Sequence, residues 1–135
     1  MFKSVCINCG IDFTYGHSST GTYCSNQCRG KHQQKQWFEN NRSLFESGKL
    51  ASRKAYKRFV IERDGERCAI CGCENEHNGK PLVMIIDHID GDASNNMPNN
   101  FRLVCPNCDS QLPTYKGANR GNGRATKGMK WFDRL

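Results

Sequence analysis

The chain has 135 residues, 36% of them hydrophobic, and its mean hydropathy is −0.76. A chain so short and polar cannot bury a large apolar core, so we expect metals or disulfides to stabilise its fold. It contains no apolar run of about 18 residues and opens with no basic-then-apolar leader, which predicts a cytoplasmic protein that does not enter a membrane.

The formal net charge of +7 is concentrated in two stretches of the chain. Residues 29–63 hold ten Lys and Arg residues against three acidic ones, and residues 116–135 hold six against one. Zinc bound by four thiolates would lower the total, because each such group carries a net negative charge, so the distribution matters more. Two basic stretches favour a polyphosphate partner, whereas solvated helix faces and a disordered tail are the alternative.

Eight of the nine cysteines fall into four close pairs, and this regularity favours zinc over disulfides, especially in a reducing cytoplasm. The pairs are Cys6/Cys9, Cys24/Cys28, Cys68/Cys71 and Cys105/Cys108. We expect two structural zinc sites, each completed by two pairs, and we expect Cys73 to be the spare cysteine.

The first two pairs lie within residues 3–30 and predict one tetrahedral zinc site. Gly10 permits the tight turn of a zinc knuckle, and Ser25 is a suitable N-cap for a helix that places Cys24 and Cys28 about one turn apart. The pattern resembles a treble-clef finger. His17 and His32 are not expected to bind the metal, because four cysteines already complete a tetrahedron.

Two helices are predicted after this finger. Apolar residues recur at three- and four-residue steps from Asn26 to about Ser47, and Gly48 is a suitable helix stop. We assign residues 1–47 to the finger and its helix, and residues 48–66 to a basic linker helix, expected from Ser52 to Arg63. The polar face of that second helix could follow a phosphate backbone or be plain solvated surface. Its basic residues are Arg53, Lys54, Lys57 and Arg58.

The next stretch predicts a β-hairpin followed by a helix, in a protein of the small, zinc-stabilised α+β class. Residues 67–72 repeat the knuckle pattern, residues 74–80 are typical of a loop, and residues 81–86 of a strand that delivers Asp87 and His88. Residues 91–99 are loop by composition, residues 101–104 form the return strand, and Pro106 suits the first turn of a helix. Because strand residues alternate faces, Asp87 and His88 can serve one substrate only if the strand bends or bulges.

From Cys68 to about Arg120 the sequence resembles the HNH endonucleases, the ββα-metal nucleases, in the phage-like group with zinc-clamped knuckles. The matching residues are Cys68-x2-Cys71, Asp87 to Asp92, Asn95-Asn96, Asn100 to Cys108, and Ser110-Gln111-x2-Thr114-Tyr115. The resemblance implies that residues 67–120 form a hairpin-plus-helix module that hydrolyses DNA phosphodiesters with a divalent cation. It also implies that His88 is the first H and Asn100 the N.

One position departs from the family pattern. The family has His or Asn directly after the last zinc cysteine, and this chain has Asp109. The role of that position in the family is to hold the catalytic cation. A carboxylate is a good ligand for hard cations, so we expect a preference for Mg²⁺ or Mn²⁺ over softer ions such as Ni²⁺ or Zn²⁺.

The reaction itself sets the expected roles, because phosphodiester hydrolysis needs an activated water and a cation for the developing charge. His88, whose unperturbed pKa is about 6.5, is expected to be the general base. Asp87 and Asp109 are expected to bind one Mg²⁺ or Mn²⁺, and Asn100 to lock the hairpin loop or orient His88. The second zinc is expected to be structural, because four sulfurs leave no position for water.

The Gly-rich basic tail, residues 121–135, is expected to grip DNA without sequence preference, although a floppy tail is the alternative. Arg124 and Lys127 in this tail, with Lys116 and Arg120 before it, would carry this contact. The predicted function is therefore a DNA endonuclease acting on double-stranded DNA, for homing or linked to DNA packaging. The alternative is a non-enzymatic double zinc-finger protein with a degenerate HNH centre. Four points stay open. They are the partner of the N-terminal finger (DNA or a protein), the target sequence, the choice between a nick and a double-strand break, and the oligomeric state.

Overall fold

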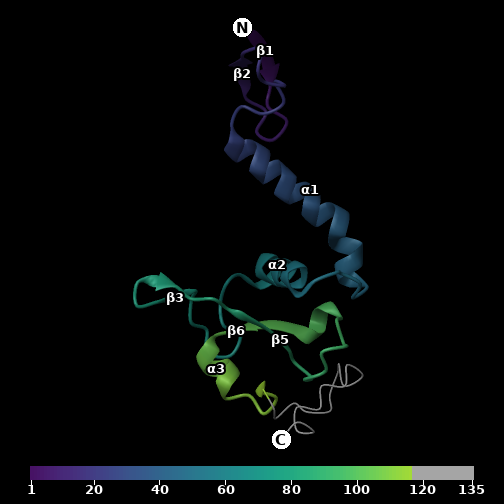
Figure 1. Cartoon of the computed structure of the whole chain (residues 1–135), viewed down its shortest axis with the longest axis vertical. Coiled ribbons are helices and arrows are strands. Elements are labelled where there is room, and N and C mark those ends of the chain that lie inside the picture. The colour runs from purple at the N-terminus through teal and green to yellow at the C-terminus, as the bar shows by residue number, and fades with distance from the viewer. Residues whose placement is uncertain (117–135) are drawn as a thin grey trace, which may run out of the picture. The chain divides into compact units, whose positions relative to one another are not determined.

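A computed structural model of the chain describes residues 1–116 and shows a small α+β protein (Figure 1). The Cα positions divide into two compact units, residues 1–42 and residues 43 onward. Helix α1 (Asn26–Glu46) begins in the first unit, and its last turn belongs to the second. None of the helices within residues 1–116 combines the length and apolar composition needed to cross a lipid bilayer.

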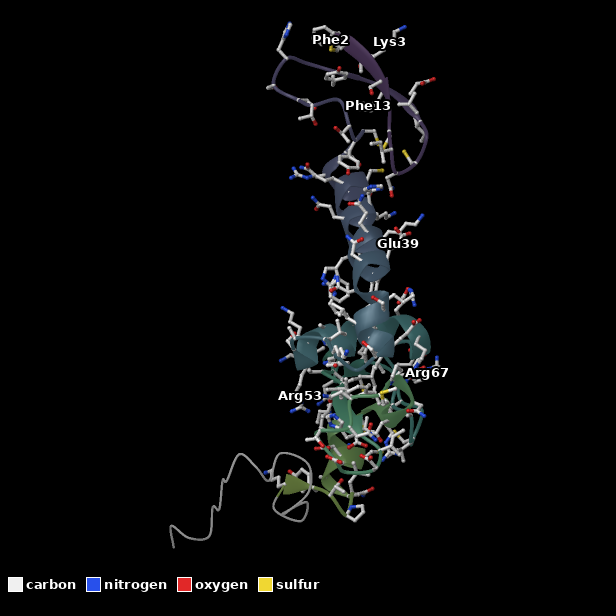
Figure 2. The ribbon with its side chains drawn as sticks, turned by 90° about the vertical axis from the view of Figure 1, so that its right-hand side faces the viewer. Phe2, Lys3, Phe13, Glu39, Arg53 and Arg67 are labelled. Carbon is white, nitrogen blue, oxygen red and sulfur yellow. The ribbon has the colours of Figure 1, made fainter. Side chains whose placement is uncertain are left out.

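The first unit is a β-hairpin followed by α1. Strands β1 (Phe2–Val5) and β2 (Asp12–Tyr15) pair antiparallel, and the chain between them turns at Gly10, whose φ is +73°. The Gly10 N–H donates to the Cys6 carbonyl at 2.8 Å, which closes the knuckle turn expected there. Phe2 and Phe13 project from this hairpin, as Figure 2 shows.

Ser25 caps the start of α1 as the sequence predicts. Its hydroxyl accepts a hydrogen bond from the Cys28 N–H at 3.1 Å, and its carbonyl accepts from the Arg29 N–H. A capping hydroxyl satisfies one of the N–H groups that a helix start leaves unpaired. The cap thereby fixes Cys24 and Cys28 on either side of the first turn.

The second unit begins at the last turn of α1, which ends in a glycine cap. The Lys49 N–H donates to the Leu44 carbonyl and the Gly48 N–H to the Phe45 carbonyl, with Gly48 at φ +69°. This pair of bonds is the Schellman arrangement, which requires a left-handed residue at the helix end. Helix α2 (Arg53–Asp64) follows, and the Ser52 hydroxyl accepts from the Ala55 N–H at its start.

The core of the second unit lies between α2 and the β5–β6 hairpin (Figure 1). Strands β5 (Ile85–His88) and β6 (Phe101–Val104) pair antiparallel, and the three-residue helix η1 (Pro98–Asn100) precedes β6. The buried face of α2 is formed by Tyr56, Phe59 and Val60, and the ring of Phe59 stacks on that of Phe45 at 4.5 Å. The most buried apolar residues are Tyr56, Phe59, Val60, Met84, Phe101, Leu103 and Val104.

Residues 74–88 differ from the expected loop and strand. A short hairpin, β3 (Glu76–His77) and β4 (Lys80–Pro81), occupies part of the predicted loop, and β5 starts only at Ile85. Asn78 and Gly79, at φ +53° and +69°, form its two-residue turn. Asn-Gly is a strong signal for such a turn, because both residues tolerate positive φ, and the sequence interpretation overlooked it.

Carbonyl groups along both edges of the β5–β6 hairpin accept hydrogen bonds from outside it. Arg53 donates to the Ile86 carbonyl at 3.2 Å, Arg63 to the Phe101 carbonyl at 2.8 Å, and the Ala69 N–H to the Leu103 carbonyl at 2.8 Å. Lys57 donates to the Met84 carbonyl, just before β5 begins. Basic residues of α2 therefore hold the hairpin in place. Helix α3 (Pro106–Ser110) lies against β5 and starts with Pro106, as predicted.

We expect Phe59→Ala to lower the free energy of unfolding by about 3–5 kcal/mol, because it empties a fully buried ring site. Phe59 is 1% exposed. Urea unfolding at constant zinc concentration measures the change. Val83→Ala is the control, since Val83 is 71% exposed and its truncation should change the free energy by less than about 0.5 kcal/mol. Equal losses in the two variants would contradict this assignment of the core.

Candidate functional site

The last four paired cysteines converge on one point in the second unit. The ligand atoms of Cys68, Cys71, Cys105 and Cys108 all lie within 4.8 Å of one another. The Cys71 and Cys105 sulfurs are 3.8 Å apart, and the Cys105 sulfur accepts from the Cys108 N–H at 3.4 Å. A zinc–sulfur bond of about 2.3 Å implies tetrahedral edges of about 3.8 Å, so this cluster could hold zinc.

The first four cysteines form a matching cluster in the first unit. Cys6, Cys9, Cys24 and Cys28 also place their ligand atoms within 4.8 Å of one another. The Cys24 sulfur lies 3.7 Å from that of Cys9 and 3.5 Å from that of Cys28. These distances also suit a tetrahedral zinc ion, so both predicted groups of four are brought together.

Hydrogen bonds inside each cluster separate the pKa values of its thiols. Backbone N–H groups, that of Cys24 foremost, lower the pKa of Cys6 to about 6, while hydrogen bonding to Cys28 raises the pKa of Cys24 to about 12. Burial raises the pKa of Cys68, but backbone N–H groups outweigh it and lower that pKa to about 6. Burial also raises the pKa of Cys108 to about 12. A divalent cation would replace the remaining thiol protons, so binding should weaken in acid.

Cys73 lies beside the second cluster without belonging to it. Hydrogen bonding to the Cys71 side chain raises the pKa of Cys73 to about 12, and Cys105 acts in the same direction. The four cysteines that share one centre are the four predicted ones. Cys73 is therefore an adjacent thiol, as expected for the spare cysteine.

An open pocket of about 470 Å³ lies next to α3 and the end of β5. Its lining includes Asp87, His88 and Asp109, three of the four residues predicted to carry catalysis. Arg53 and Lys116 also line the pocket and supply positive charge. Within residues 1–116, the structure thus places two carboxylates, an imidazole and two basic side chains around one space.

Asp87 and His88 both line this pocket. Asp87 is the cross-strand partner of Arg102 and His88 that of Phe101, so the ladder stays one for one and, of the two alternatives expected there, a bulge is excluded. Strand β5 ends at His88, so the pocket lies around a strand end. The Arg102 Nε donates to Asp87 Oδ2 at 2.7 Å, and this ion pair fixes the carboxylate.

His88 is held on two sides. Its Nε2 lies 3.0 Å from Asn96 Oδ1, and its ring lies 4.8 Å from that of Phe101. The sequence interpretation did not assign a role to Asn96 or Arg102. Arg102 could have been found from the register, because it pairs directly with Asp87. Asn96 belongs to the matching Asn95-Asn96 pair, but no local pattern indicates that its side chain contacts His88.

Asn100 locks the loop between β5 and β6. Its amide donates to Asp90 Oδ1 and to the Asn95 carbonyl, each at 2.9 Å, and its Oδ1 accepts from the Asp90 N–H. Asn100 is 6% exposed, so these bonds satisfy a buried amide. Hydrogen bonding by the Asn95 side chain lowers the pKa of Asp90, which keeps its carboxylate charged. Of the two roles expected for Asn100, these bonds correspond to the first, locking of the loop.

Asp109 follows Cys108 directly and lies on α3, so the second cysteine cluster controls its position. Its N–H donates to the Cys105 carbonyl at 2.9 Å. Because Cys105 and Cys108 belong to the cluster, the pocket carboxylate of Asp109 is tied to the same point that holds the knuckle. The cluster and the pocket are therefore one connected arrangement.

The residues predicted to contact DNA have different surroundings. Arg53 and Lys57 each donate to backbone carbonyls at β5, Lys54 is exposed, and Arg58 is half-buried. Figure 2 marks Arg53 on the ribbon of α2. Lys116 lies in the pocket lining, with its ammonium 5.0 Å from the centre of the Tyr115 ring. The remaining predicted contacts, Arg120, Arg124 and Lys127, fall outside the described residues, as does the tail.

Comparison with known proteins adds one relative with a stated activity. Over 79 residues, 58% of this chain, the sequence is 33% identical to H-N-H endonuclease F-TflIV of Escherichia phage T5. This chain is a distant relative of an HNH endonuclease. The match covers 34% of that protein, so the chain spans about a third of its length. No family model matches the chain, and no solved structure matches it.

We expect purified protein to bind two zinc ions per chain and Cys71→Ser to lose one of them, because it removes one of four sulfurs. Metal analysis after gel filtration measures the content. Cys73→Ser is the matched control, two residues away and outside the group of four, and it should keep both ions. Equal zinc loss in the two variants would contradict the assignment of the cluster.

Proposed function

We propose that the protein is a metal-dependent DNA endonuclease of the HNH type. The observation that carries the proposal is the shared pocket of Asp87, His88 and Asp109 beside a cysteine cluster that could hold zinc. Similarity to a phage HNH endonuclease supports it. Residues 67–120 would form the nuclease module, residues 48–66 the basic linker helix, and residues 1–47 the finger and its helix.

In this proposal His88 is the general base. It takes a proton from the water that attacks phosphorus, and an imidazole suits this step near neutral pH. Asp87 and Asp109 would hold a divalent cation, which would stabilise the negative charge that develops at the scissile phosphate. Two carboxylates on separate elements, β5 and α3, flank the same pocket, so they suit a shared hard cation. The Arg102 ion pair keeps Asp87 oriented.

The basic residues that line or flank the pocket would hold the DNA backbone. Arg53 uses one guanidinium N–H on the Ile86 carbonyl, and a guanidinium carries five N–H donors, so it can also bind a phosphate oxygen. Lys54, Lys57, Arg58 and Lys116 would add charge, with Arg120, Arg124 and Lys127 beyond them. Phosphate contacts of this kind give affinity without sequence preference. Double-stranded DNA is the proposed substrate, with a role in homing or in DNA packaging.

We expect the protein to nick supercoiled plasmid in Mg²⁺ or Mn²⁺ and EDTA to stop the reaction. His88→Ala should lower the nicking rate about 10²–10⁴-fold, because it removes the base, while DNA affinity changes little. The matched control is His77→Ala, since His77 is an exposed histidine outside the pocket lining. Gel electrophoresis reports nicking, and a filter-binding assay reports affinity.

Salt-sensitive DNA binding with no nicking in any divalent metal would contradict the nuclease. It would favour a double zinc-finger protein that binds nucleic acid through a degenerate HNH centre. Zinc analysis of the same sample is needed, so that unfolded protein is not mistaken for an inactive site.

We expect Asp109→His to change the metal preference of nicking. Imidazole is a softer ligand than carboxylate, so activity in Mg²⁺ should fall about tenfold or more relative to activity in Ni²⁺ or Zn²⁺. Nicking rates across a series of metals, divided by the Mn²⁺ rate of the same variant, measure the change. If the wild type and the variant gave the same ratios, Asp109 would not be a ligand of the catalytic cation.

A further inference from the structure

The hydrogen bond between His88 and Asn96 determines which ring nitrogen carries the proton. Asn96 Oδ1 lies 3.0 Å from His88 Nε2, and an amide oxygen can only accept. Nε2 must therefore donate. A neutral imidazole has a single N–H, so its Nδ1 keeps a lone pair. The Asn96 amide thus selects the ring form in which Nδ1 can accept a proton from water.

The loop around Asn96 is fixed by bonds that do not involve His88. The Asn95 carbonyl accepts from the Asn100 amide at 2.9 Å, and the Asn95 amide donates to Asp90 Oδ2 at 2.7 Å. The backbone next to Asn96 is therefore anchored to the buried Asn100. These contacts restrict where the Asn96 side chain can lie relative to β5.

Gly48 lies close to the backbone of Asn96. A Cβ built on Gly48 would lie 3.0 Å from the Asn96 carbonyl oxygen and 3.2 Å from the carbonyl carbon. Backbone atoms cannot give way as a flexible side chain can, and φ at Gly48 is +69°, which side chains rarely adopt. A larger residue at this position would require the Asn96 backbone to shift by a few tenths of an ångström. The glycine at the end of α1 therefore leaves the space that the backbone of Asn96 occupies.

We propose that Asn96 positions the catalytic histidine, and that Asn96 can take this position because residue 48 is a glycine. The proposal rests on the proposed role of His88 as general base. Phe101 restricts the ring on another side, at 4.8 Å, so loss of the Asn96 bond frees the Nε2–H while the ring stays in the pocket. Residue 48 lies outside residues 67–120, the proposed nuclease module. The position of His88, the proposed general base, therefore also depends on a residue outside that module.

The first test is the NMR signal of the His88 Nε2–H in ¹⁵N-labelled, zinc-loaded full-length protein at a pH where the ring is neutral. Wild type should show a slowly exchanging Nε2–H, assigned by its absence in His88→Ala. Asn96→Ala should lose this signal, and Asn96→Asp should restore it, because a carboxylate oxygen also accepts. The matched control is Asn99→Ala, an exposed asparagine of the same loop, which should keep the signal. A signal unchanged in Asn96→Ala overturns the proposal.

The second test separates turnover from binding. Asn96→Ala should lower kcat for nicking about 10–100-fold, the usual effect of losing a partner that orients a site residue, and leave the Kd for DNA within about twofold. Gly48→Ala should lower kcat as well. The matched control is Gly79→Ala: Gly79 has the same φ, +69°, and a Cβ there would meet nothing within 4 Å. It places a side chain at the same positive φ without the Asn96 contact, so its kcat should hold.

The outcomes distinguish this proposal from the proposed function. If wild type does not nick in any divalent metal, the nuclease assignment fails and the kinetic role of Asn96 fails with it, while the NMR signal still decides whether Asn96 holds the ring. If wild type nicks and Asn96→Ala nicks equally fast, the nuclease assignment survives and the positioning role is overturned. If Gly48→Ala and Gly79→Ala lost equal amounts of kcat, Gly48 would have no specific role in positioning Asn96.

Discussion

The second unit depends on the convergence of Cys68, Cys71, Cys105 and Cys108 on one point. A chain of this size and polarity has few apolar contacts with which to fix distant segments. The cluster joins the knuckle at residues 67–72 to the junction of β6 and α3, and Asp109 follows the last of its cysteines. The position of the Asp109 carboxylate therefore depends on the cysteine cluster. The position of the Asp87 carboxylate depends on the pairing of β5 with β6 and on the ion pair with Arg102.

Features that a local pattern encodes could be predicted from the sequence. Both groups of four cysteines, the N-cap at Ser25, the return strand at residues 101–104 and the Pro106 helix start appear where their spacing or local chemistry predicts. Asp87, His88 and Asp109 also line one pocket, which follows from a hairpin and a helix clamped at the same cluster. The roles of these residues in catalysis remain proposals.

Features that depend on the neighbourhood of a residue could not be predicted in the same way. Strand β5 starts only at Ile85, after the Asn78-Gly79 turn and directly after Met84, whose carbonyl accepts from Lys57. Asn96 lies in a polar loop, and only the folded chain shows that its amide faces His88 and that its backbone leaves little room for a Cβ at residue 48. Arg53 and Lys57 were assigned to DNA from their charge, and the structure adds a bond from each to a backbone carbonyl.

The hydrogen bonds from Arg53, Arg63 and Ala69 to the β5–β6 hairpin also occupy acceptors at the edges of this two-stranded sheet. A two-stranded sheet has two open edges, and an open edge is a template on which another copy of the chain can add a strand. Here the Ile86, Phe101 and Leu103 carbonyls are already engaged by groups of the same chain. An added strand would have to break these bonds and displace two charged side chains, which makes strand addition at the edges of this hairpin unfavourable.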